Sequence, residues 1–345
     1  AYQIYVDGTF LQFSMNYHRV VVQLLTWGIQ LAKLNGDTFD KVVYERAQKS
    51  LDFLDACIDP VSGELPNYGS NDGALFFKLT NDDYRVYRSQ LDDLRAVLNG
   101  YIYFGSKSSL WYGIQPKQKK QAALTEISEF TKGGYYIIQE GNTKTFIRCG
   151  AYKDRPYQSD NLHIDIWIDG KNVLRDNGSY QYNTSKELIN YFNGSEGHNT
   201  ISIDGKDQMQ KGDRFIWNYW IKYAKANLTE SQNKFVFKGE IKGFKHLDSN
   251  ILHQRIVNKS KGLNEWIVKD IISGVENKTS FQYWHFSNEM IAKLSITSLD
   301  RNNKKLEPIL EEKWYSSYYG VKEKSTRLSF ESNTNMFTTK ITYKK

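Results

Sequence analysis

The chain has 345 residues, of which 40% are hydrophobic and 14% aromatic, and its formal net charge is +7 at pH 7. This length predicts two domains. The lysines and arginines do not form the dense blocks of a nucleic-acid-binding protein, so we expect no nucleic-acid partner. No apolar run reaches the roughly 18 residues that a membrane-spanning helix needs, whereas the positive surplus suits an anionic partner.

The tyrosine and cysteine content gives further indications of the kind of protein. The 24 tyrosines suit sugar binding, because a phenol ring stacks on the apolar face of a sugar while its hydroxyl forms hydrogen bonds. Tyrosine is also favoured in strands, and composition alone does not separate the two interpretations. Cys57 and Cys149 match no disulfide framework or metal spacing, which favours buried free thiols.

The first third of the chain has the period of helices. Apolar residues recur at helical spacing between residues 17 and 34, and Asn35-Gly36 supplies a stop. Asp37 is a candidate N-cap for a second helix that continues to residue 56. A third helix is expected from about Asp83 to Leu98, followed by Asn99-Gly100. Long helices joined by glycine-containing loops are typical of bundles and helical toroids.

After about Gly133 the period changes to two. Candidate strands at residues 135–139 and 145–149 flank a turn, and residues 163–168 alternate before Asp169-Gly170. Further short strands continue to the end of the chain. Many strands, Asx-Gly turns and only 5 prolines predict antiparallel sheets packed as a sandwich.

Two clusters in the helical part could carry chemistry. Residues 14–19 (SMNYHR) gather polar groups at the start of the first helix, where backbone N–H groups favour an anion, although an ordinary capped helix explains them too. The loop LPNYGSNDGA holds Tyr68 between amides and glycines. A phenol beside cations can act as base and then as acid, while the alternative is an Asx-rich turn.

A pair of arginines forms the third cluster. Arg85 and Arg88 are three residues apart, so on a helix they would share one face and could clamp a carboxylate or sulfate. The alternative pairs them with nearby carboxylates, namely those of Asp82, Asp83, Asp92 and Asp93.

The fourth cluster lies on the predicted strands. It comprises RPYQSDNLHID, then DNGSY, then GHNT and DGKDQ, and it includes His163, Asp176 and His198, which are residue types that bind zinc. Their wide spacing leaves buried, hydrogen-bonded side chains as the alternative.

Taken together and in this order, these motifs resemble the heparinase II/III-like lyases, from about Asp7 to about Gln208. The resemblance implies an α+β, multidomain protein: a partial (α/α) toroid in residues 1–128, followed by an antiparallel multi-sheet β-sandwich in residues 129–345. It implies a polysaccharide lyase in the periplasm, at the cell surface or secreted. The Lys-, Asn- and Tyr-rich composition indicates a bacterial protein.

Such lyases cleave uronate-containing chains by β-elimination, which needs a neutraliser for the carboxylate, a base and an acid. The resemblance assigns Asn16 and His18 to neutralisation and Tyr68 to proton transfer. We expect Tyr68, Asn16 and His163 to face one groove between the toroid and the sandwich. The substrate, an acidic polysaccharide, is expected to contact Tyr17, Arg19, Asn67, Asn71, Arg85, Arg88, Arg155 and Gln158.

The sequence departs from the family pattern in the sandwich. Pro156 stands where many lyases carry a histidine, and Gln158 stands where zinc-containing members have a ligating histidine. Asp176 and His198 match the other two metal positions, so they are the candidate ligands of zinc or calcium, or members of a hydrogen-bond network with Gln158. His163 could replace the missing base, and Arg155 could hold the substrate carboxylate.

Two other functions stay open. The protein could bind polysaccharide without cleaving it, as in capsule or exopolysaccharide production, or serve as a carbohydrate-binding module through Trp217, Tyr219 and Trp220. Family members usually have several helices before residue 7, so we expect a chain with this beginning to lack part of its toroid and to be inactive in that form. The sequence does not indicate an oligomeric state.

Overall fold

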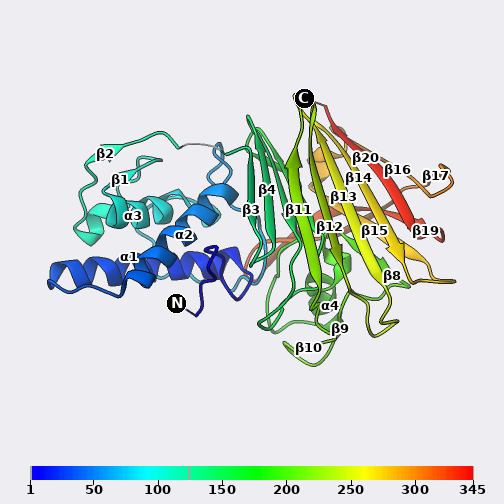
Figure 1. Cartoon of the computed structure of the whole chain (residues 1–345), viewed down its shortest axis with the longest axis horizontal. Helices are drawn as coiled ribbons and strands as arrows, with labels where there is room; N and C mark the ends of the chain where they lie inside the picture. Colours follow the sequence, from blue (N-terminus) through cyan, green and yellow to red (C-terminus); the bar gives the residue numbers. More distant parts are fainter. Residues whose placement is uncertain (1, 123–124, 345) are drawn as a thin grey trace.

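The computed structural model describes residues 2–122 and 125–344, with a helical part at one end and a larger sheet part at the other (Figure 1). The helical part contains α1 (Met15–Leu34), α2 (Lys41–Cys57), α3 (Arg88–Asn99), η1 (Ser108–Tyr112) and the short paired strands β1 (Tyr101–Ile102) and β2 (Gln118–Lys119). None of the helices in the described ranges combines the length and apolar character needed to cross a bilayer.

Two predicted helix starts were wrong. The backbone N–H of Asp37 donates to the carbonyl of Ala32, so Asp37 belongs to the end of α1, and Asp40 precedes α2. The third helix begins at Arg88 instead of Asp83. Residues 83–87 leave the helical path because Val86 forms a β-bridge with Glu64 and the N–H of Tyr87 donates to Gly63.

Within the described ranges, the sheet part contains three antiparallel sheets of at least four strands. The five-stranded sheet follows chain order: β3 (Ile127–Phe130), β4 (Tyr135–Glu140), β5 (Thr143–Arg148), β6 (Ile164–Ile168) and β7 (Lys171–Leu174). The four-stranded sheet has the order β18 (Ile309–Tyr318), β19 (Val321–Ser332), β15 (Ser280–Phe286) and β8 (Ile201–Ile203). The antiparallel multi-sheet architecture predicted from the sequence is confirmed.

The seven-stranded sheet lies on the outer side of the molecule (Figure 1). Its order is β11 (Ala224–Glu230), β12 (Lys234–Ile241), β13 (Leu252–Ser260), β14 (Glu265–Ser273), β20 (Met336–Tyr343), β16 (Leu294–Leu299) and β17 (Lys305–Leu306). Burial alternates strictly along β13, as expected for a strand with one face in the core. The segments that connect the strands of the three sheets contain α4 (Lys186–Asn193), η2 (Ser195–Gly197), η3 (Asn288–Met290) and the paired strands β9 (Gln210–Lys211) and β10 (Trp217–Asn218).

One continuous cluster of buried apolar side chains extends from the helices into the sheets. Cys57 and Cys149 are buried free thiols, as predicted. Three α-helices precede the sheets in the described part of the chain. The toroid expected for this part stays a prediction, and so does the domain boundary between residues 128 and 129.

Candidate functional site

A pocket of about 570 Å³ lies where the helical part meets loops of the sheet part. One wall comes from the N-terminal segment, the first turns of α1 and Ser70. The other wall comes from sandwich loops that carry Arg155, Tyr157, Tyr182 and Phe215. Two residues that the sequence predicted to bind substrate, Tyr17 and Arg155, therefore line the same pocket.

Two phenols meet inside this pocket. The hydroxyl of Tyr17 donates to Oδ2 of Asp72 at 2.8 Å, and it forms a short hydrogen bond with the hydroxyl of Tyr182. Because Tyr17 has a single hydroxyl hydrogen, its oxygen accepts the hydrogen of Tyr182 when both phenols are neutral. Burial and the hydrogen bond that Tyr17 donates to Asp72 raise the pKa of Tyr17. Tyr182 has a raised pKa chiefly because it is partly buried.

The local sequence explains how Tyr17 and Asp72 come together. Ser14 caps α1 by accepting from the N–H of Tyr17 at 3.1 Å, and its hydroxyl donates to the carbonyl of Ser70 at 2.5 Å. The loop passes so close to α1 that a Cβ on Gly69 would lie 2.2 Å from the carbonyl oxygen of Phe13, and Gly69 has φ +83°. Only glycine fits there.

The pocket wall that comes from the sandwich loops consists of aromatic side chains and one cation, Arg155. The ring of Tyr182 contacts Phe215, Tyr319 and Tyr157 at centroid distances of 5.4, 5.7 and 6.1 Å. The exposed guanidinium of Arg155 lies 5.5 Å from the ring centroid of Phe215. A cation beside half-buried phenols can hold a carboxylate near groups that transfer protons.

A buried layer supports the phenols from behind. The Nδ2 atom of Asn16 lies 3.5 Å from Oδ1 of Asp72, and its Oδ1 atom accepts from Arg19 at 3.1 Å. The guanidinium of Arg19 lies over the rings of Tyr84 and Tyr87, at 4.1 and 4.4 Å. Asn16 is 3% exposed and Arg19 1% exposed, so neither reaches the pocket.

The expectation that Tyr68, Asn16 and His163 face one groove was wrong, because their side chains are only 2%, 3% and 0% exposed. Tyr68 points into the core, where its ring contacts Tyr135 and Phe146 and its hydroxyl accepts from Nε of Arg148 at 3.0 Å. Burial raises the pKa of Tyr68 far above its ordinary value, which opposes its use as a base.

His18 is also enclosed. Its ring lies between Phe10 and Phe53, and Nε2 forms a short hydrogen bond with the hydroxyl of Ser50. Burial lowers the pKa of His18 to about 3, so the ring is neutral at pH 7. A neutral, enclosed imidazole is poorly suited to neutralise a substrate carboxylate.

The remaining predicted binding residues bind the protein's own backbone or amides. Arg85 donates to Leu65 and Asn67, and Arg88 donates to the carbonyls of residues 60 and 61, so the expected carboxylate pairs are absent for both arginines among the described residues. They also do not share a helix face, since α3 begins only at Arg88. Asn67 donates to the carbonyl of Ser316 at 2.8 Å.

Two further amides are buried. Asn71 is 6% exposed; its N–H donates to Ser179 at 2.9 Å, and its side chain accepts from the N–H of Gly73. Gln158 is 3% exposed and donates to the carbonyl of Phe192. Asn71 therefore links the helical part to a loop of the sheet part, whereas Gln158 links a loop to α4 within the sheet part.

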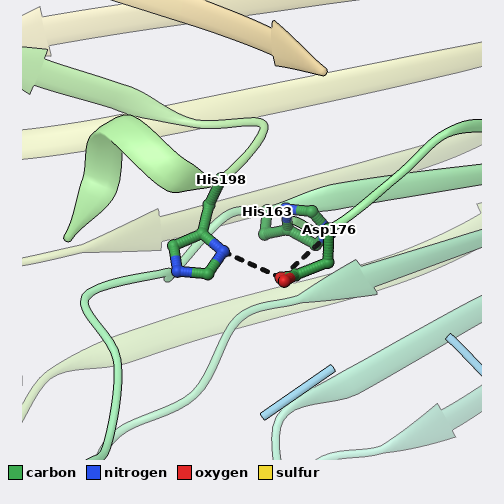
Figure 2. A group of neighbouring side chains, drawn as sticks. All are labelled: His163, Asp176 and His198. Atoms are coloured by element: carbon green, nitrogen blue, oxygen red, sulfur yellow. Dashed lines mark hydrogen bonds and ion pairs between the residues drawn. The ribbon is translucent and has the colours of Figure 1, made fainter. Parts of the chain in front are cut away.

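A second polar group lies inside the sandwich. Figure 2 shows His163, Asp176 and His198 turned toward one another, all with 0% exposure. His163 precedes β6 and Asp176 follows β7, so the antiparallel β6–β7 hairpin brings them together. Nδ1 of His198 lies 2.8 Å from Oδ2 of Asp176. Burial is the largest single influence and lowers the pKa of His198, but the charges of Asp176, Asp160 and Asp207 and the hydrogen bond to Asp176 together outweigh it, so the pKa is raised.

Distances alone would admit an ion here, because one ligand atom from each of the three residues lies within 4.8 Å of the others. The position of the proton on the His163 ring argues against a bound ion. The N–H of Asn199 donates to Nδ1 of His163 at 3.0 Å, so the neutral ring carries its proton on Nε2, and this N–H faces the carboxylates of Asp165 and Asp176 at 3.8 and 3.9 Å. A metal ion needs the lone pair that this nitrogen lacks.

The donor set therefore does not fit the family's metal site. Gln158 replaces one histidine, and His163 cannot take its place, which leaves Asp176 and His198. Calcium prefers about six to eight oxygen ligands, more than these carboxylates offer. The alternative expectation, a hydrogen-bonded group, describes Asp176 and His198; Gln158 binds elsewhere.

The aromatic segment at residues 217–220 does not form a sugar platform. Trp217 is 3% exposed and donates to the carbonyl of Tyr157, and Trp220 donates to the carbonyl of Trp217. Tyr219 is exposed, but it stands as a single ring beside His246. The two tryptophans therefore stabilise the loop that carries Tyr157 and do not present a surface for a sugar.

Sequence reasoning missed Tyr182 and Asp72. Asp72 lies within the loop LPNYGSNDGA and Tyr182 lies two residues after the motif DNGSY, but neighbouring residues were given the roles. A useful signal was available: a second tyrosine follows Tyr180 by two residues, and the loop contains one carboxylate.

Comparison with known proteins places the chain in a family. The model for the heparinase II/III-like C-terminal domain matches residues 122–344. The chain belongs to the heparinase II/III-like family. A heparin-sulfate lyase from Bacteroides stercoris is 23% identical over 216 residues, which cover 59% of this chain and 30% of that protein.

Solved structures of this family share the fold. Heparinase III superposes with a TM-score of 0.77 and 16% identity, over 99% of this chain and 55% of its own. The heparan sulfate lyase HepC from Pedobacter heparinus gives a TM-score of 0.74 and 17% identity, over 100% of this chain and 54% of its own. The chain thus spans about a third of the curated relative and about half of the solved ones.

Proposed function

We propose that this protein is a polysaccharide lyase that cleaves an acidic, uronate-containing glycan by β-elimination in the pocket lined by Tyr17, Arg155 and Tyr182. One observation carries the proposal: phenols from the two parts of the molecule are hydrogen-bonded to each other in a pocket that also holds an exposed arginine. Its relatives are named as heparin and heparan sulfate lyases, which supports an elimination reaction on a polysaccharide.

Each requirement of the reaction has a candidate group. In this proposal, the guanidinium of Arg155 binds the uronate carboxylate and stabilises the charge that develops as the C5 proton leaves. The phenol pair of Tyr17 and Tyr182 takes up that proton and returns one to the departing glycosidic oxygen. The aromatic wall supplies rings on which a sugar can stack.

The catalytic assignment differs from the one that the family resemblance suggested. Tyr68, His18 and His163 are enclosed, so we assign proton transfer to the phenols that line the pocket. Asn16 is retained as a support for Asp72. Placement in the periplasm, at the cell surface or outside the cell stays a prediction.

The test is product formation. Full-length natural protein is incubated with a panel of uronate polymers, and the ultraviolet absorbance of the unsaturated product is followed. We expect product from at least one polymer, and loss of at least about 100-fold in kcat for Tyr182→Phe. Tyr44→Phe is the matched control, because among the described residues the Tyr44 hydroxyl forms hydrogen bonds only with Thr38 and Phe39, near the surface.

A second function is binding without cleavage. It is favoured by the burial of Asn16, His18 and Tyr68, the residues to which the family resemblance assigned catalytic roles. Binding of a uronate polymer with no unsaturated product from any polymer would support this alternative and reject the lyase.

A further inference from the structure

We infer that Asp72 is the terminal proton acceptor of a relay that runs from Tyr182 through Tyr17. This inference rests on the proposed lyase function and deepens it. Asp72 does not touch the substrate in this scheme, so it is a positioning residue that acts through the two phenols.

The geometry gives the relay a direction. Oδ2 of Asp72 accepts from Tyr17 at 2.8 Å, and Tyr17 in turn accepts from Tyr182. Oδ1 of Asp72 is held by the N–H of Ala74 at 2.9 Å and lies 3.5 Å from Nδ2 of Asn16. One carboxylate oxygen is thus anchored by the backbone, and the other is left for the phenol.

The surroundings explain why a relay is needed. Both phenols have raised pKa values, so a free phenolate at neutral pH is unfavourable. Tyr182 can accept a proton only if it loses its own at the same time. The carboxylate at the end of the chain makes that possible without charge being left on a phenol.

The proton balance is complete within these residues. The C5–H bond of the uronate breaks, its proton forms an O–H bond with Tyr182, the Tyr182 proton passes to Tyr17, and the Tyr17 proton passes to Asp72. The electron pair of the C5–H bond forms the C4–C5 double bond as the C4–O bond breaks. The relay then runs in reverse and protonates the departing oxygen, which restores the Asp72 carboxylate.

The first test separates the relay from binding. In the full-length protein we expect Asp72→Asn to lower kcat by about 100-fold or more, with KM within about threefold of the natural protein. Asp82→Asn is the matched control, since this carboxylate is exposed and its one hydrogen bond within the described ranges is to Thr80. The double variant with Tyr17→Phe should be no slower than Tyr17→Phe alone, because both changes break one chain.

A second readout does not depend on turnover. Tyrosines labelled with ¹³C at Cζ are observed by NMR, and their resonances are assigned from Tyr17→Phe and Tyr182→Phe. In Asp72→Asn at fixed pH we expect both the Tyr17 and the Tyr182 resonances to move, while Tyr44 stays in place. Thermal unfolding establishes that each variant is folded.

The outcomes are distinct. If the natural protein forms product and folded Asp72→Asn keeps its kcat, or if Tyr182 does not respond to the change, the relay is rejected and the lyase stands. If the natural protein forms no product, the lyase proposal fails, and the response of Tyr182 alone then upholds or rejects the coupling of the three groups.

Discussion

The Nε atom of Arg148 donates a 3.0 Å hydrogen bond to the hydroxyl of Tyr68 and so joins β5 of the sandwich to a loop of the helical part. Arg148 is 0% exposed and lies about equally close to the rings of Phe13, Tyr135 and Tyr152, at 5.2, 5.1 and 5.2 Å. Tyr68, to which the family resemblance assigned proton transfer, is thus a buried residue that connects the two parts of the molecule.

We predict that Tyr68→Phe lowers stability and leaves the chemistry intact. Loss of a buried hydrogen bond to a charged partner should reduce the free energy of unfolding by about 1–3 kcal/mol. Urea unfolding of Tyr68→Phe beside Tyr44→Phe measures the difference, and kcat is compared at a temperature where both are folded. A selective loss of kcat in folded Tyr68→Phe would return the catalytic role to this residue.

Arg155 should govern substrate affinity. Replacing it by alanine removes the exposed guanidinium of the pocket, and a charged hydrogen bond of this kind contributes about 1.5–3 kcal/mol, or roughly 10- to 100-fold in KM. Arg155→Lys should recover only part of this, because lysine cannot form a two-pronged contact with a carboxylate. Arg301→Ala, an exposed turn position, is the control. Equal KM values for Arg155→Ala and the control would contradict this assignment.

The buried His163–Asp176–His198 group should not require a metal. We expect substoichiometric zinc and calcium by elemental analysis, and an unchanged melting temperature after chelation. Imidazole ¹⁵N NMR should find His163 protonated on Nε2, as the N–H of Asn199 dictates. One zinc per chain, together with a lower melting temperature in chelator, would overturn this prediction; Asp176→Asn treated in the same way is the control.

His18 should contribute to acid unfolding. Its pKa is about 3 in the folded protein and about 6.5 in the unfolded chain, so between these values the unfolded state binds the additional proton. Stability is therefore complete above pH 6.5 and declines as the pH falls toward 3. Each unit of pKa difference is worth about 1.4 kcal/mol, so the contribution is roughly 4–5 kcal/mol.

Urea unfolding at pH 7 and pH 4 measures this dependence. His18→Asn should lose less stability on acidification than the natural protein does. His246→Gln is the control, because that ring is only half-buried and its protonation should change the free energy of unfolding little. An identical slope in His18→Asn and the natural protein would exclude His18 as a source of acid sensitivity.

The fold was more predictable than the site, for a physical reason. Periods of 3.6 and 2 are local properties, so the order of helices and strands could be derived from neighbouring residues. The helix start at Asp83 failed because a distant partner, Glu64, draws Val86 into a bridge. Local propensity carries no information about such a partner.

The site depends on contacts between distant positions. Tyr17 and Asp72 are 55 residues apart and Tyr17 and Tyr182 are 165 apart, so no spacing in the sequence announces their meeting. Tyr68 illustrates the converse error: a loop rich in turn residues suggested exposure, yet Arg148, 80 residues away, holds its hydroxyl inside. Residue type indicated the chemistry, but only packing decides which tyrosine can perform it.

The meeting of Tyr17 and Tyr182 has a consequence for dissecting the molecule. Each isolated fragment would hold one phenol of this pair and one of the two pocket walls, so under the proposed lyase function neither a helical fragment nor a sandwich fragment should retain turnover. Mixing the fragments would restore the acid–base unit only to the extent that they reassociate. Enzymatic rate would then serve as a direct gauge of how completely the two pieces dock.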